Sequence, residues 1–143
     1  MRVSVIVAAG AFVLGGCASA PERDQQMASA LQQLEGADYA ATERCLSTFE
    51  YDRVEVLDQQ HLLFESNTGQ ELWLNTLRTK CPGLREDDVL AFEMSGNRLC
   101  SLDTATVMER FLFWQRTGPT CSLGEFQQLT EGQAQLLREA LES

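Results

Sequence analysis

The sequence predicts a small, β-rich α+β domain of about five or six antiparallel strands, with a C-terminal helix, an N-terminal helical tether and two disulfides. Short apolar segments separated by turn sequences predict the strands. Apolar residues spaced four apart near the C-terminus predict the helix. The chain has 143 residues, of which 44% are hydrophobic and 22% are charged, and these values suit one ordinary globular domain.

Residues 1–16 have the composition of a secretory signal peptide. One positive charge, Arg2, precedes the apolar or small run 3–14, which is far shorter than the roughly 20 residues needed to span a bilayer. The run ends in Leu-Gly-Gly-Cys at residues 14–17, which resembles the bacterial lipobox. The resemblance implies cleavage before Cys17, a lipid on its thiol and acylation of the new N-terminus. We therefore expect Cys17 to be the lipid attachment site.

The residue after Cys17 bears on the membrane in which the anchor lies. It is Ala18 rather than Asp, and in lipoproteins of the enteric type Asp at this position retains the protein at the inner membrane. The resemblance therefore favours the inner leaflet of the outer membrane, facing the periplasm, where three acyl chains suffice for stable anchoring. The alternative is an ordinary signal peptide, cut after Ala18 or Ala20, with an incidental cysteine.

The charge of the chain limits the choice of partner. The formal net charge is −10, and loss of Arg2 with the leader makes the side-chain charge of the mature chain −11. Nucleic-acid binding needs a basic stripe, so this balance argues against it. Cationic partners are favoured instead, with association rates that fall as salt rises.

Residues 17–41 are predicted to be a lipidated, partly helical tether. In the Gln-rich segment 21–36, Met27, Leu31 and Leu34 form a thin apolar stripe on one helical face, and the glycine at its end suits a helix stop. The stripe is also compatible with a first helix packed on the body. We favour a spacer that lifts a single disulfide-stapled domain, residues 42–143, off the membrane.

The first half of the domain contains strand and turn signals. Residues 53–56 alternate polar and apolar, as a half-buried strand does. Residues 58–60 suit a turn before the apolar run 62–64. The Ser-Asn-Thr-Gly sequence at 66–69 is a stronger turn signal before the strand at 72–74.

The sequence of the second half of the domain predicts a hairpin, a long strand and a helix. Residues 90–94 and 98–102, joined by 95–97, are predicted to pair as the hairpin. Residues 104–115 are rich in β-formers, and the sequence Arg-Thr-Gly-Pro at 116–119 is expected to end that strand.

The C-terminal helix has a predicted start and a predicted buried face. Thr130 and Gln133 have the spacing of a capping box, in which each side chain binds the other residue's backbone N–H. Leu137 and Leu141 follow on one face.

Cys45, Cys81, Cys100 and Cys121 are an even set in a segment expected to be exported. Two disulfides are the default there, and of the three possible pairings we favour Cys81–Cys100 with Cys45–Cys121. A zinc site is disfavoured because even the closest two cysteines have 18 residues between them. A redox centre is disfavoured because the chain has no C-x-x-C motif.

Few other residues suggest a catalytic, metal-binding or ligand-binding role. His61 is the only histidine and Asp58 lies nearby, but no G-x-S-x-G or H-E-x-x-H motif accompanies it, so a surface or strand-edge histidine is expected. Residues 86–88 are acidic but lack the alternating oxygen ligands of a calcium loop. Trp73 and Trp114 suit the core better than a ligand groove.

Four segments resemble an uncharacterised family of small Gram-negative lipoproteins, known as a domain of unknown function. They are Arg44-Cys45, residues 72–77 running on to 81–84, Arg98-Leu99-Cys100 and residues 121–126. The resemblance covers roughly residues 43–130 and implies a lipid-anchored envelope protein with the same four cysteines. It implies no activity, substrate or catalytic residue.

These observations favour a lipid-anchored, periplasm-facing envelope protein that acts as a non-enzymatic binding or accessory module. The expected partners are the membrane, through the lipid, and a cationic envelope protein or an outer-membrane complex. No cofactor or metal is expected. One alternative is an inhibitor of a basic envelope enzyme such as lysozyme, although the motifs of such inhibitors are missing. Another is a small periplasmic hydrolase that uses His61 with a carboxylate.

Overall fold

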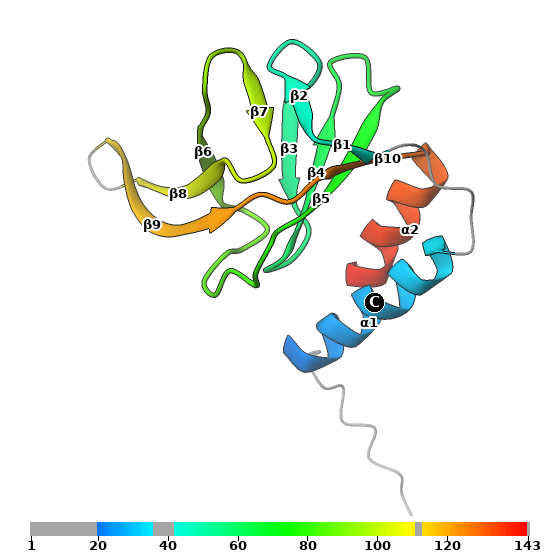
Figure 1. The fold of residues 1–143 in the computed structure, drawn as a ribbon. Coiled ribbons are helices and arrows are strands. Elements are labelled where there is room, and N and C mark those ends of the chain that lie inside the picture. The colour runs from blue at the N-terminus through cyan, green and yellow to red at the C-terminus, as the bar shows by residue number, and fades with distance from the viewer. Residues whose placement is uncertain (1–19, 36–41, 111–112, 143) are drawn as a thin grey trace, which may run out of the picture.

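The computed structural model describes residues 20–35, 42–110 and 113–142 of the chain (Figure 1). In these residues two helices accompany short antiparallel strands in three sheets, which confirms a small α+β fold with two disulfides. The elements are, in order, α1 (Ala20–Glu35), β1 (Thr42–Glu43), β2 (Cys45–Ser47), β3 (Arg53–Val56), β4 (His61–Glu65), β5 (Leu72–Thr76), β6 (Val89–Glu93), β7 (Arg98–Cys100), β8 (Thr104–Arg110), β9 (Trp114–Ser122), β10 (Phe126–Leu129) and α2 (Glu131–Glu142).

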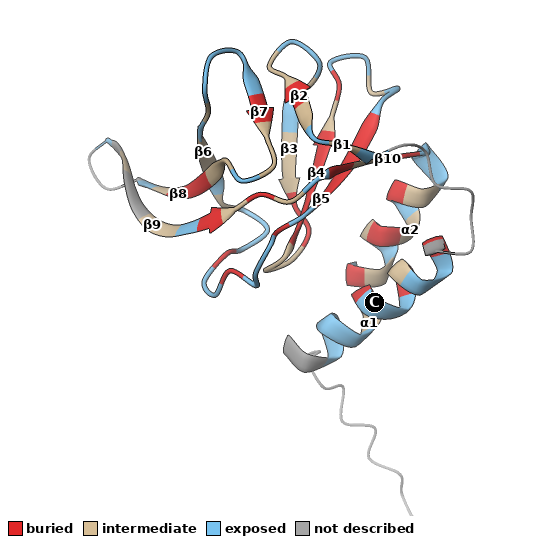
Figure 2. Cartoon of the chain, viewed as in Figure 1, coloured by how far each residue is buried: buried red, intermediate tan, exposed pale blue. Residues whose placement is uncertain are grey.

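A five-stranded sheet, in the order β1-β10-β5-β4-β3, forms the middle layer of the domain. Side chains alternate between its faces, and in β4 and β5 both sets are buried (Figure 2). Leu63 and Leu74 belong to the core under the helices, whereas Leu62, Phe64 and Trp73 belong to the core on the other face. Burial on both faces explains why the run 62–64 is continuously apolar rather than alternating.

The helices and the sheet enclose one core, which we call the helix-side core. Both α1 and α2 contribute to it, and all its fully buried members are aliphatic. They are Met27, Ala30, Leu34, Leu57, Leu63, Leu72, Leu74, Leu129, Ala134, Leu137 and Leu141.

The opposite face of the sheet packs against the remaining strands in a second core, which we call the strand-side core. Its centre is Phe64, whose ring contacts Tyr51, Phe92 and Phe126 at centroid distances of 5.2, 5.8 and 5.2 Å. Trp73 is buried in this core, as expected, and its indole N–H donates to Glu43 Oε1 at 3.3 Å.

The structure pairs the body cysteines as Cys45–Cys100 and Cys81–Cys121. The favoured pairing of Cys81 with Cys100 and of Cys45 with Cys121 is therefore wrong. The cause is strand pairing: Cys45 on β2 lies directly opposite Cys100 on β7. Loop length, the only guide in the sequence, does not report which strands become neighbours.

The predicted hairpin of residues 90–94 with 98–102 is also wrong. A turn does lie between the two segments, with Gly96 at φ +75°, but it joins two different sheets. β6 pairs with β8, and β7 pairs with β2. The local turn signal was correct, but the partners were set by packing of distant segments.

The predicted long strand 104–115 is two strands, and its predicted end lies inside the second one. β8 ends at Arg110, and β9 returns antiparallel to it, with Trp114 opposite Arg110. Residues 116–119 lie within β9, at a register shift between Thr106 and Met108. Proline is tolerated because β9 is an edge strand and the pairing is irregular there.

The local predictions for the 66–69 turn and the C-terminal helix are confirmed. The 66–69 turn is closed by the Gly69 N–H donating to the Ser66 carbonyl at 2.9 Å, with Gly69 at φ +70°. At α2, the Thr130 N–H donates to Gln133 Oε1 at 2.9 Å and the Gln133 N–H donates to Thr130 Oγ1 at 3.3 Å. This is the predicted capping box.

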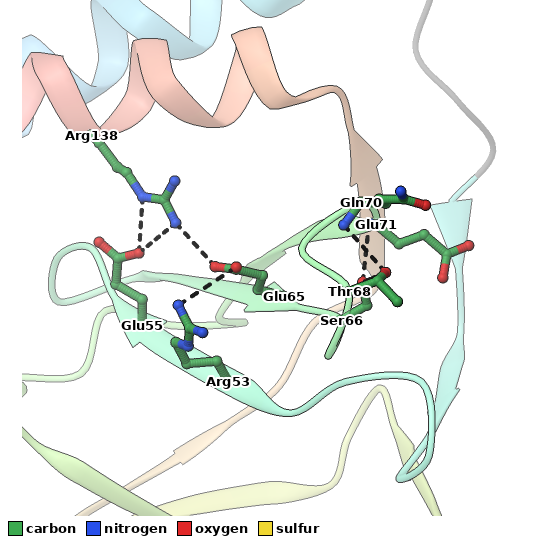
Figure 3. Close-up of polar contacts among 8 residues, drawn as sticks. All are labelled: Arg53, Glu55, Glu65, Ser66, Thr68, Gln70, Glu71 and Arg138. Carbon is green, nitrogen blue, oxygen red and sulfur yellow. Dashed lines mark hydrogen bonds and ion pairs between the residues drawn. The ribbon is translucent and has the colours of Figure 1, made fainter.

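A salt-bridge network fixes α2 to the edge of the five-stranded sheet (Figure 3). Arg138 donates to Glu55 on β3 through Nε at 3.0 Å, and its Nη2 lies 3.5 Å from Glu65 on β4. Arg53 approaches the same Glu65 at 3.6 Å. Burial alone would lower the pKa of Arg138, but the neighbouring carboxylates hold that pKa above its ordinary value.

The segment predicted to be a tether forms α1, and the expectation of a spacer does not hold for residues 20–35. Met27, Ala30 and Leu34 are 1–3% exposed in the helix-side core. Full burial of a Met or Leu side chain stabilises by roughly 1.5–3 kcal/mol. The helix is thus part of the folded domain. Gly36, the predicted helix stop, lies outside the described residues.

Candidate binding cleft beside the N-terminal helix

His61, which is buried, and Asp58, which is partly buried, form a pair at the connection between β3 and β4. His61 Nδ1 lies 2.9 Å from both carboxylate oxygens of Asp58, and the histidine is only 8% exposed. His61 therefore lies at the start of a strand, which is one of the two expected positions, but it is not on the surface. The predicted turn at 58–60 places the two side chains together, since the Gln60 and His61 N–H groups also donate to Asp58 Oδ1 at 2.7 and 2.8 Å.

The protonation of this pair follows from its contacts. Burial alone would raise the pKa of Asp58, but the hydrogen bond and charge of His61, with the two backbone N–H groups, hold that pKa below its ordinary value. Asp58 is therefore a carboxylate that only accepts hydrogen bonds, so His61 Nδ1 carries the proton. In the neutral ring Nε2 is then the acceptor, and no described residue hydrogen-bonds to it.

Two ion pairs connect the first turns of α1 to the loop between β5 and β6. Arg23 Nη2 lies 2.7 Å from Glu86 Oε1, and Lys80 pairs with Asp24. All four side chains are about half exposed, so each pair contributes little to stability, roughly 0–1 kcal/mol. Arg23 also donates to the Leu141 carbonyl at 3.3 Å, at the end of α2.

Three adjoining cavities surround these ion pairs, and we call them together the α1 cleft. They have volumes of about 350, 330 and 250 Å³. Arg23 and Glu86 line the first two, and Asp24, Asp58 and Lys80 line the second and third. The third cavity contains His61 and has an apolar wall formed by Met27, Ala28 and Leu31 of α1.

The chemistry available in the α1 cleft is restricted. Its lining offers fixed charges of both signs and one imidazole, but the described residues that line it include no Ser, Thr or Cys. The described part of the chain also holds no group of three His, Cys, Asp or Glu side chains that could bind a metal ion. Of the acidic residues 86–88, the first two line the cleft.

The other residues singled out from the sequence lie apart from the cleft or outside the described residues. The four body cysteines form the two disulfides of the strand side. Cys17 lies outside the described residues, and so does the side chain of Trp114. The lipid attachment therefore stays a prediction.

Sequence reasoning missed most of the charged residues of the cleft, among them Arg23, Asp24 and Lys80. One signal was available, since Lys80 is the only lysine of the chain. Its pairing with Asp24 spans 56 residues, however, and no local pattern reports such a contact.

The fold and the cleft define a small disulfide-bonded α+β domain with a charged surface cleft. The chain belongs to a family of unknown function (DUF6491), whose model matches residues 1–143. Searches of the curated proteins and of the solved structures found no match. Neither described helix is long and apolar enough to cross a membrane.

Proposed function

We propose that this protein is a lipid-anchored, periplasm-facing envelope protein that acts as a non-enzymatic binding module, with the α1 cleft as its ligand site. The observation that carries the proposal is the lining of the cleft. His61, Lys80 and Asp24 line a cavity that also has an apolar wall from α1. Such a lining suits a small ligand that has a charged or hydrogen-bonding group and an apolar part.

The same lining favours binding over catalysis. A nucleophilic mechanism needs a hydroxyl or thiol within reach of a base, and the described lining residues provide neither. Asp24 and Lys80 are paired with each other, so a charged ligand group can exchange with one partner of an ion pair that is worth little by itself.

The proposed anchor is tested through Cys17. Cys17→Ser removes the thiol that would take the lipid, so we expect loss of palmitate labelling and release of the protein from the membrane fraction. The control is Cys45→Ser, which alters a body cysteine and leaves the lipobox intact. Persistent membrane attachment of Cys17→Ser would show that the anchor is not a lipid on this residue.

The proposed ligand site is tested by native mass spectrometry of the mature protein, isolated from membranes in mild detergent. We expect a small-molecule adduct on the wild-type protein that is lost in His61→Gln and Lys80→Gln. The matched control is Asn97→Ala, which changes an exposed residue far from the cleft. An adduct of equal occupancy in all four proteins, or in none, would contradict the assignment.

One observation favours a second function, a hydrolase that activates water. An imidazole whose Nδ1 is held by a carboxylate is a general-base arrangement, and His61 has it. If this function holds, turnover of p-nitrophenyl acetate above the buffer rate is lost in His61→Gln and lowered in Asp58→Asn. Equal rates in the wild-type protein and His61→Gln would exclude it for this ester.

A further inference from the structure

We infer that the anchor holds this domain directly against the bilayer, with one defined end facing the phospholipid headgroups. That end, which we call the anchor end, consists of residues 22–24, 57–60 and 77–88. The inference rests on the proposed lipid at Cys17. It goes further, because a lipid alone leaves the distance and the orientation of the domain open.

The distance follows from the start of α1. The helix begins at Ala20, three residues after Cys17, and three residues span at most about 11 Å. Each headgroup layer of a bilayer is roughly 5–8 Å thick. The first turn of α1 therefore lies within the headgroup layer or directly upon it.

The orientation follows from the packing of α1, which cannot act as a free linker. Met27, Ala30 and Leu34 are buried in the helix-side core. At the start of the helix, Arg23 contacts Glu86 and the Leu141 carbonyl, and Asp24 pairs with Lys80. A lipid that holds the first turn of α1 at the membrane therefore also holds the loop between β5 and β6 and the end of α2 close to it.

The strand connections show which surface faces the lipid. The β3–β4 and β5–β6 connections lie at the same end of the molecule as the start of α1, and the β2–β3, β4–β5 and β6–β7 connections lie at the opposite end (Figure 1). The contacts of Arg23 and Asp24 agree with this view.

Charge is compatible with a membrane contact at this end. The anchor end has four of the ten basic side chains of the mature chain, and its net charge is −2 of the total −11. This net charge is close to the share that an even spread would give these residues, so the end meets ordinary repulsion from anionic headgroups, but it offers a concentration of basic side chains that can pair with them. Its basic side chains are Arg23, Arg78, Lys80 and Arg85.

The test is fluorescence quenching of the mature, lipidated protein in vesicles of phosphatidylethanolamine and phosphatidylglycerol that contain a headgroup nitroxide lipid. A fluorescent amino acid replaces either Thr79, exposed at the anchor end, or Asn97, exposed at the opposite end. We expect quenching to be several-fold stronger at position 79. A matched variant adds about 12 Gly and Ser residues before Ala20, roughly 20 Å of flexible linker, and we expect it to bring the quenching at position 79 down to that at position 97.

The outcomes separate the inference from the proposed anchor. Equal quenching at positions 79 and 97 in protein bound to vesicles, or quenching at position 79 that the linker leaves unchanged, would overturn the inference and leave the anchor standing. Protein that carries no lipid and does not bind the vesicles would overturn the anchor, and the inference with it.

Discussion

The cores on the two faces of the five-stranded sheet are stabilised by different interactions. On the helix side, every fully buried apolar residue is aliphatic. Ion pairs such as that of Arg138 on α2 with Glu55 on β3 also join the helices to the sheet. On the strand side, the core contains Phe64, Trp73 and Phe126, and both disulfides lie on this side.

The lengths of the elements explain the difference. The helices α1 and α2 have 16 and 12 residues, enough to present several apolar side chains each to one core. The strands β2 and β7 have three residues each and, among the described strands, pair with each other alone. A two-stranded sheet of that size is only marginally stable in water. The disulfide between β2 and β7 therefore adds stability that packing alone does not provide.

The largest expected effect is on the strand side. The double variant Cys81→Ser/Cys121→Ser opens a loop with a sequence separation of 40 residues, and we expect the free energy of unfolding to fall by about 4 kcal/mol. Urea denaturation measures it, and wild-type protein treated with a reductant should fall further because it loses both disulfides. An unchanged urea midpoint would mean that packing alone holds this side.

On the helix side, Leu137→Ala tests whether aliphatic packing has comparable weight. Leu137 is 0% exposed, and its truncation leaves a cavity between α2 and the sheet, so we expect a loss of about 3 kcal/mol. The matched control is Leu136→Ala on the same helix, where the side chain is only partly buried. Equal losses for the two variants would contradict the assigned core.

A third variant tests how a non-covalent contact stabilises the strand side. The fully buried Asn75 amide donates to the Gly124 carbonyl at 2.9 Å and accepts from the Gly124 N–H at 3.0 Å. Asn75→Ala leaves both backbone groups unpaired, so we expect a loss of about 2 kcal/mol. In the same urea measurement, the exposed-site control Asn97→Ala should change stability by less than about 0.5 kcal/mol.

The smallest expected effect concerns the pH dependence of stability at Asp58, which lines the cleft. The pKa of Asp58 is lowered in the folded state, so the stability it contributes is fully present above the unfolded value near 4 and is lost as pH falls through the folded value. Asp58→Asn should therefore be less stable than wild type at pH 6, and the difference should shrink as the pH is lowered from 6 to values below 4. A stability difference that stays constant over this range would contradict the role of the carboxylate.

Much of the local structure was predictable because its signals lie within a few residues. The capping box of Thr130 and Gln133 and the turn at 66–69 are read from adjacent side chains and backbone groups. The candidate cleft was not predictable in this way. It depends on Asp24 meeting Lys80 and on Arg23 meeting Glu86, which are contacts between α1 and a loop more than 50 residues away.

The sequence by itself determined the α+β class, the even set of body cysteines, the C-terminal helix and the expectation of a lipid on Cys17. Periodicity and composition are local or global properties of the chain, and they need no knowledge of neighbours in space. The tertiary structure alone decided that Cys45 pairs with Cys100, that β6 pairs with β8 rather than with β7, and that His61 is buried against Asp58. The physical reason is that strand pairing and burial are set by which distant apolar faces come together, and a segment of four or five residues does not encode its partner.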